Sequence, residues 1–143
     1  MEFSLRCDFE SLEISRSEAI WGSVWIESCG EVFPEFEWND MPVAFTCELA
    51  SVLEAARGKS FRSGRVRFFD GPFWVMVDCP VPGECVVTLG GSGGSKALAM
   101  IPMGKIVESV RSIARGLLEA CHSRGWGGNP DVIRLANCLE SLR

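Results

Sequence analysis

The feature that most constrains the fold is a series of short runs in which apolar and polar residues alternate. In the first run, Phe3, Leu5, Cys7 and Phe9 are separated by polar or charged residues. An alternation with a period of two predicts a half-buried β-strand. Comparable runs, bounded by glycine or proline turn signals, occupy residues 19–28, 31–33, 64–69, 73–79, 84–89 and 96–101. Short strands joined by tight turns predict a meander of antiparallel hairpins.

Three other stretches carry apolar residues at the spacing of a helix. The first covers residues 40–57, where Asp40 is the expected N-cap, Pro42 lies in the first turn and Gly58 follows the last turn. The other two helices occupy the C-terminal third, and Asn129-Pro130 marks the start of the last one. The order is therefore strands, helix, strands and two helices.

Length and composition fit one globular domain. A chain of 143 residues suits one domain better than two, and 47% hydrophobic with 23% charged residues are ordinary values. We therefore expect one α+β domain over residues 1–143. It should contain a mainly antiparallel sheet of about six or seven strands, with one inserted helix and two C-terminal helices packed on it.

Several features predict a cytoplasmic protein. Residues 1–10 lack the basic start and apolar stretch of a signal peptide. No apolar run approaches the roughly 20 residues that a helix needs to span a bilayer. The seven cysteines are an odd number without a C-x-x-C motif, which suits a reducing compartment. Cys79 and Cys85 flank a turn, and we expect buried small apolar side chains there rather than a disulfide.

Two features that could support chemistry carry weak signals. Residues 90–95 are rich in glycine, but Ser95 precedes Lys96 and Ala97 follows it, unlike the pattern of a phosphate-binding loop. We interpret this stretch as a mobile hairpin loop. His122 is the only histidine, and it falls in the last turn of a helix, where the dipole favours a cation. The sequence therefore predicts no enzymatic activity, no metal and no cofactor.

The charge is distributed unevenly along the chain. The net charge is −5, yet residues 1–40 hold ten acids and only two bases, Arg6 and Arg16. This asymmetry indicates a partner selected by electrostatics, and it disfavours nucleic acid because phosphates need lysine and arginine. Five bases follow the first helix, and we expect them to form a solvated strand face or to pair with the acidic strands: Arg57, Lys59, Arg62, Arg65 and Arg67.

The densest acidic group lies between residues 27 and 40 and is interleaved with aromatic residues. It is either a solvated loop with its aromatics turned inward or a protein-binding rim with aromatic anchors. In the second interpretation, the partner-binding residues are Glu27, Glu31, Glu35, Phe36, Glu37, Trp38 and Asp40. Trp21 and Trp25 share a strand face, and we expect them to pack beneath a helix; a ligand-stacking platform is the alternative.

Two distinctive runs support a resemblance. They are GSVWIESCGEVFP over residues 22–34, followed by Trp38-Asn39-Asp40, and RFFDGPF over residues 67–73. In these runs the chain resembles a family of small uncharacterised bacterial proteins. Such proteins are similar in size and acidity to the immunity proteins that accompany secreted polymorphic or contact-dependent toxins. The motifs are turns, caps and buried aromatics, which explain a fold and identify no activity.

The resemblance implies an immunity protein that neutralises a bacterial toxin, and the acidic surface would steer it onto a basic toxin domain. The expected partner is thus a protein, and neither nucleic acid nor a membrane. The alternative is a small-ligand or regulatory domain with an apolar pocket between sheet and helices. An enzyme would need a polar pocket that gathers His122 with carboxylates or a thiol.

Overall fold

The computed structural model describes residues 2–57, 63–98 and 100–142. These residues confirm the α+β class, with antiparallel sheets, one inserted helix and two later helices. The elements are β1 (Ser4–Ile14), β2 (Ile20–Ser28), β3 (Glu31–Phe33), β4 (Asn39–Asp40), α1 (Pro42–Ala56), β5 (Ser63–Arg67), β6 (Trp74–Val81), β7 (Glu84–Gly91), β8 (Gly94–Ala97), β9 (Ile101–Pro102), α2 (Met103–Ser123) and α3 (Pro130–Ser141). Gly58, Lys59 and Arg62, expected at a helix end and in a basic loop, lie outside the described residues.

The strands form two sheets instead of one. The N-terminal sheet has the order β1-β2-β3, with β4 also paired to β2. The second sheet has the order β5-β6-β7-β8, with β9 paired to β7. The pairs are antiparallel, as expected for hairpins, and β2 is a central strand as predicted. The inserted α1 separates the two groups of strands along the chain.

Tight turns connect neighbouring strands where the sequence predicts them. Cys29 and Gly30 join β2 to β3 with φ angles of 53° and 79°, as a hairpin turn with two left-handed residues requires. The glycine-rich residues 90–95 differ from expectation, because Gly90 and Gly91 belong to β7 and Gly94 and Ser95 to β8. This stretch is therefore mostly paired strand with a short turn.

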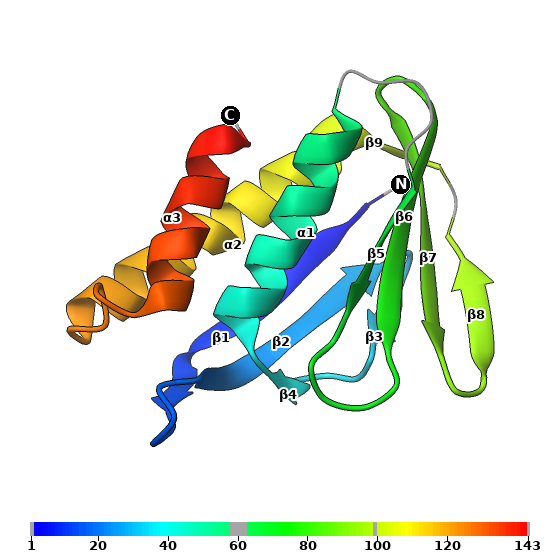
Figure 1. Ribbon diagram of the computed structural model, residues 1–143. Helices are drawn as coiled ribbons and strands as arrows, with labels where there is room; N and C mark the ends of the chain where they lie inside the picture. Colours follow the sequence, from blue (N-terminus) through cyan, green and yellow to red (C-terminus); the bar gives the residue numbers. More distant parts are fainter. Residues whose placement is uncertain (1, 58–62, 99, 143) are drawn as a thin grey trace.

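The three helices and the two sheets enclose the core. Figure 1 shows α1 in the middle of the molecule, with the second sheet on one side and α3 on the other. Phe45 and Leu49 of α1 are fully buried with Val24 and Ile26 of β2 and with residues of the second sheet. A smaller cluster joins α2 and α3 to the first two strands and α1. Burial of these apolar surfaces supplies the main stabilisation of the fold.

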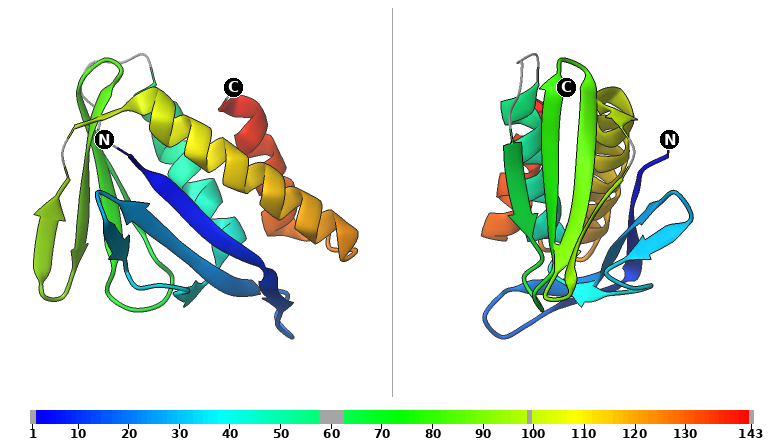
Figure 2. Two further views of the ribbon diagram at one scale, coloured as in Figure 1. Left: turned by 180° about the vertical axis from the view of Figure 1, so that it is seen from behind. Right: turned by 90° about the vertical axis from the view of Figure 1, so that its right-hand side faces the viewer.

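Helix α2 protects the outer edge of β1. Both views in Figure 2 show α2 running alongside this strand. The backbone N–H of Leu5 donates to Oγ of Ser109 on α2 (2.8 Å). A Cβ atom at Gly116 would lie 2.3 Å from Cζ of Phe9, so glycine is needed there for the ring of Phe9 to reach the helix. Helix α2 thus lies along the edge of β1 and occupies one of the strand's free backbone donors.

The two predicted helix caps have different outcomes. Asn129 is the N-cap of α3, and its side chain accepts a hydrogen bond from the N–H of Asp131 (2.9 Å), as predicted. The prediction of Asp40 as the N-cap of α1 is wrong, because Met41 occupies that position without a side-chain cap. Asp40 belongs to β4 instead, where its carboxylate meets donors from several parts of the chain.

Candidate protein-binding surface

The outer face of the N-terminal sheet carries Glu27, one of the predicted acidic residues. Along β2, Val24 and Ile26 point into the core, so Trp25 and Glu27 lie on the opposite, outer face. Arg6 of β1 is the cross-strand neighbour of Trp25 and adds one positive charge to this face. The expectation that Trp25 packs beneath a helix is wrong, because the helices pack on the inner face.

A tight turn places Phe36 over Trp25. The N–H of Trp38 donates to the carbonyl of Glu35 (3.2 Å), and the carbonyl of Trp38 accepts from the N–H of Val24 on β2 (2.8 Å). Phe36 and Glu37 therefore occupy the tip of a turn that is fastened to the sheet. The ring of Phe36 meets Trp25 edge-on, with centroids 5.1 Å apart. Yet Phe36 remains 65% exposed, although a large apolar side chain gains free energy by burial.

Three carboxylates surround this aromatic pair. Glu27 accepts a hydrogen bond from Nε1 of Trp25 (2.9 Å), while the side chains of Glu35 and Glu37 are exposed on either side of Phe36. Within the described part of the chain, no lysine or arginine forms an ion pair with these three carboxylates. We call Trp25, Glu27, Glu35, Phe36 and Glu37 the acidic–aromatic patch.

An acidic hollow adjoins the patch at Glu27. Its empty volume is about 650 Å³, part of which is open to solvent, and it is lined by the carboxylate residues Glu2, Glu27 and Glu31, together with the exposed Val32 and the β2–β3 turn. Glu2 is held there because its carbonyl accepts a hydrogen bond from Oγ of Ser28 (2.5 Å). Glu31 is partly neutralised, since it forms an ion pair with Lys96. The hollow has the size and charge to receive a cationic side chain.

Two of the predicted contact residues serve the fold instead. Asp40 is 0% exposed, and its two carboxylate oxygens accept four hydrogen bonds. The donors are Nε1 of Trp38 (3.0 Å) and the backbone N–H groups of Met41 (2.8 Å), Phe69 (3.0 Å) and Asp70 (3.1 Å). Trp38 turns inward and packs edge-on against Phe73. Asp40 thus fastens β4 to the turn between β5 and β6 and is not available to a partner.

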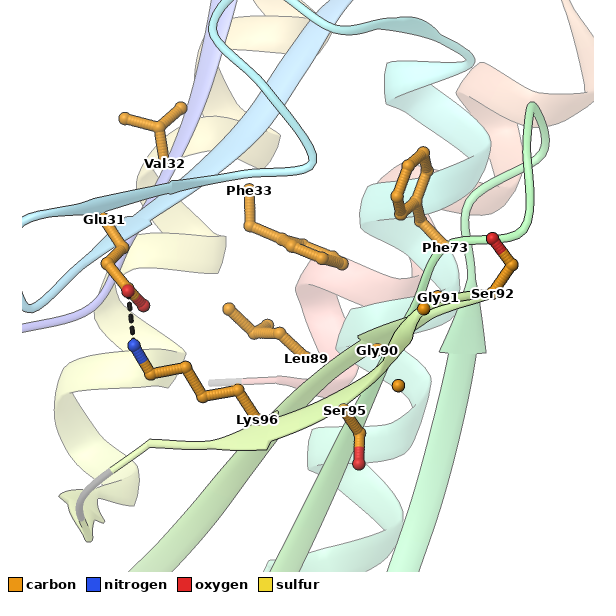
Figure 3. Close-up of a pocket in the computed structure, with 12 residues that line it drawn as sticks. Glu31, Val32, Phe33, Phe73, Leu89, Gly90, Gly91, Ser92, Ser95 and Lys96 are labelled. Atoms are coloured by element: carbon orange, nitrogen blue, oxygen red, sulfur yellow. Dashed lines mark hydrogen bonds and ion pairs between the residues drawn. The ribbon is translucent and has the colours of Figure 1, made fainter.

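A second hollow lies between the edges of the two sheets. Figure 3 shows β3 on one side and the β7–β8 hairpin on the other, with Glu31 and Lys96 pointing toward each other across the opening. Phe33, Phe73 and Leu89 supply apolar surface, and the glycine-rich residues 90–94 form one wall. The empty volume is about 1050 Å³, part of which is open to solvent. We call this the inter-sheet cavity.

His122, the candidate for acid–base chemistry, lies apart from both hollows. It is exposed at the end of α2. Among the described residues, no group of three or more His, Cys, Asp or Glu side chains is placed to hold a metal ion. No helix within residues 2–57, 63–98 and 100–142 is long and apolar enough to cross a membrane.

Two of the bases that follow the first helix lie on the other sheet. Arg65 and Arg67 alternate with the buried Val66, which places them on the outer face of the second sheet. The guanidinium of Arg65 lies over the ring of Trp74, 4.3 Å from its centroid, in a cation–π contact. These arginines therefore form a solvated strand face, one of the two expected arrangements, and do not neutralise the acidic–aromatic patch.

Sequence reasoning missed Glu2 and Val32 as parts of this surface, and it missed that the buried Trp25 supports Phe36 from beneath. The alternation of β2 does not tell its two faces apart, because both faces are apolar. The hairpin register could have found Glu2, since pairing Ser4 with Glu27 brings the start of the chain beside the β2–β3 turn.

No known family, curated protein or solved structure matches the chain.

Proposed function

We propose that the chain is a binding protein whose acidic–aromatic patch contacts a cationic surface on a protein partner. The observation that carries the proposal is the exposure of Phe36 on a turn fastened to β2, with Glu27, Glu35 and Glu37 around it. Protein interfaces combine an apolar anchor at the centre with a polar rim. The patch has this composition, and its carboxylates have no ion-pair partner within the described chain.

The backbone of the turn supports this interpretation. Glu37 has a φ angle of 56°, in the left-handed region that side chains other than glycine rarely adopt. Such a residue costs about 1 kcal/mol or more and is typical of segments shaped for binding. The strained turn directs Phe36 toward solvent, so the chain accepts both backbone strain and an exposed aromatic ring at one place.

The proposed partner is a bacterial toxin domain with a basic surface, which makes the chain an immunity protein. An acidic inhibitor is drawn rapidly to a basic protein, and the attraction weakens with salt because the charges are solvent-exposed. The acidic hollow beside Glu27 would accept a lysine or arginine of the partner. Phe36 would supply the apolar anchor next to it.

Calorimetric titration against the toxin domain encoded by the neighbouring gene tests this function. We expect binding with a dissociation constant below about 1 μM at 0.05 M salt and weaker binding at 0.5 M salt. An unrelated acidic protein of equal net charge is the control, and it should not bind under either condition. Absence of binding to the toxin domain at micromolar concentrations would refute the immunity function.

The inter-sheet cavity favours a second candidate function, the binding of a small apolar ligand. Its apolar surface from Phe33, Phe73 and Leu89, with the Glu31–Lys96 ion pair at the opening, has the composition of small-molecule sites. A thermal-shift screen of metabolites tests it. If a compound stabilises the unchanged protein more than the Lys96→Met variant, the ligand lies in this cavity. If it stabilises the unchanged protein and the variant equally, the ligand lies elsewhere.

A further inference from the structure

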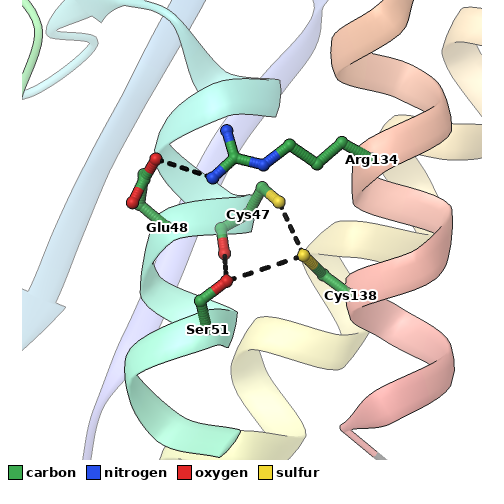
Figure 4. A network of polar contacts seen from close by, with 5 residues as sticks. All are labelled: Cys47, Glu48, Ser51, Arg134 and Cys138. Atoms are coloured by element: carbon green, nitrogen blue, oxygen red, sulfur yellow. Dashed lines mark hydrogen bonds and ion pairs between the residues drawn. The ribbon is translucent and has the colours of Figure 1, made fainter. Parts of the chain in front are cut away.

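Two pairs of thiols lie close together in the described chain, and they differ in their access to solvent. Sγ of Cys79 on β6 lies 2.6 Å from Sγ of Cys85 on β7, and both residues are 0% exposed. Sγ of Cys47 on α1 lies 2.7 Å from Sγ of Cys138 on α3 (Figure 4). Cys47 is also fully buried, but Cys138 is only partly buried.

The packing of α1 against α3 keeps the second pair aligned. Glu48 follows Cys47 on α1, and its Oε1 forms an ion pair with Nη2 of Arg134 on α3 (2.9 Å). Arg134 lies one helical turn before Cys138. Oγ of Ser51 donates to the carbonyl of Cys47 (3.0 Å) and lies 3.7 Å from Sγ of Cys138. The two thiols therefore face each other between helices that are also joined by polar contacts on either side.

A groove between the helices exposes Cys138 to small molecules. It has an empty volume of about 630 Å³ and is lined by residues of α1 and α3: Ala50, Ser51, Glu54, Asn137, Cys138 and Ser141. A small oxidant can reach the sulfur of Cys138 through this groove. The Cys79–Cys85 pair lies in the core between the second sheet and the helices, where such a reagent has no comparable access.

We propose that Cys47 and Cys138 form an oxidant-reactive dithiol, which a peroxide converts into a disulfide between α1 and α3. The sulfur of Cys138 attacks one peroxide oxygen, the O–O bond breaks, and water leaves with formation of a sulfenic acid. The sulfur of Cys47 then displaces the hydroxyl group of Cys138 as a second water, and the S–S bond forms. The two thiols lose two electrons and two protons in total, and hydrogen peroxide is reduced to two molecules of water.

The environment of Cys47 agrees with this order of events. Burial, together with the hydrogen bond and charge of the Cys138 thiol, raises the pKa of Cys47 to about 12. Cys47 is therefore protonated at neutral pH, which disfavours it as the first nucleophile toward peroxide. In the second step its proton passes to the hydroxyl group that leaves Cys138 as water. Cys138, which faces the groove, makes the first attack, and Cys47 acts as the resolving residue.

Treatment of the reduced protein with hydrogen peroxide tests the proposal. The protein should carry Cys29→Ser, because Cys29 is exposed and would otherwise cross-link two molecules. We expect a mass lower by two hydrogen atoms and a cross-linked peptide containing Cys47 and Cys138. Cys79 and Cys85 should remain thiols that react with an alkylating reagent after unfolding. A Cys79–Cys85 cross-link that forms before the Cys47–Cys138 cross-link would overturn the proposal, and so would conversion of Cys138 to a sulfinic acid.

Three variants separate the roles of the two residues. Cys47→Ser should leave a sulfenic acid on Cys138 that dimedone traps, and Cys138→Ser should abolish oxidation of the pair. Cys85→Ser is the matched control and should form the Cys47–Cys138 bond as the parent does. In the parent, oxidation should raise the thermal midpoint by roughly 10 °C, since the bond closes a long loop. An equal rise of the thermal midpoint on oxidation of Cys138→Ser would contradict the Cys47–Cys138 disulfide. This variant tests the proposal even if Cys47→Ser does not fold.

Discussion

The two ends of the segment from Glu35 to Asp40 are alike in composition and opposite in role. Both ends place a carboxylate next to an aromatic ring. At the first end, Phe36 is exposed between Glu35 and Glu37; at the second, Asp40 is buried and accepts four hydrogen bonds. The convergence of N–H donors from another element therefore decides whether such a carboxylate supports the fold or faces a partner.

The largest effect should come from the buried end. We expect Asp40→Ala to lower the free energy of unfolding by about 3–5 kcal/mol, because it leaves several buried donors without an acceptor. Denaturant unfolding measures this change. The control is Asp70→Ala, an exposed carboxylate nearby, which should change stability by no more than about 0.5 kcal/mol. Equal midpoints for the two variants would show that Asp40 contributes no more to stability than an exposed carboxylate does.

The exposed end should show the reverse pattern, with a loss of binding and little loss of stability. We expect Phe36→Ala to weaken binding of the toxin domain about 30-fold, as an anchor residue does. Its free energy of unfolding should fall by no more than about 1 kcal/mol, because most of the ring is exposed and its ring contact is with Trp25. Calorimetry and denaturant unfolding give the two values.

Ile133→Ala is the matched control for Phe36→Ala. Ile133 is 51% exposed and lies on α3, so its removal changes a comparable apolar surface far from the acidic–aromatic patch. Its affinity for the toxin domain should equal that of the unchanged protein. If both substitutions weaken binding to the same degree, Phe36 has no special role.

The carboxylates beside Phe36 should affect the rate of association. We expect the double variant Glu35→Lys with Glu37→Lys to slow association with a basic toxin domain about tenfold at low salt. At about 0.5 M salt its association rate should approach that of the unchanged protein, because salt screens the charges. Stopped-flow mixing measures the rates. Glu10→Lys with Glu13→Lys makes the same charge change on exposed residues of β1 and should slow association less. Equal slowing by both pairs would assign the effect to net charge alone.

Glu31 should have the smallest effect on stability. Its ion pair with Lys96 joins two side chains that are both largely exposed, so Glu31→Gln should change the free energy of unfolding by less than about 0.5 kcal/mol. Glu48→Gln removes a similarly exposed pair with Arg134 and provides the reference value. A loss several times larger for Glu31→Gln would mean that this pair helps to hold the two sheets together.

Much of the fold was predictable because its signals are local. The alternation in β1, the positive-φ turn at Cys29-Gly30 and the cap at Asn129 depend on residues close in sequence. The division into two sheets was not predictable, since strand order depends on contacts between distant segments. Of the predicted contact residues, Glu27, Glu35, Phe36 and Glu37 belong to the acidic–aromatic patch and Glu31 lines the adjoining hollow, while Trp38 and Asp40 turn inward. That this surface binds a partner stays a prediction.

Local sequence patterns indicate most of the elements, the class of the fold and the concentration of negative charge in the first 40 residues. Tertiary packing controls which carboxylates face solvent and which cysteines face each other. Asp40 finds two of its donors at Phe69 and Asp70, and Cys47 meets Cys138 across two helices. These pairings join residues far apart in the chain, and local periodicity carries no information about them.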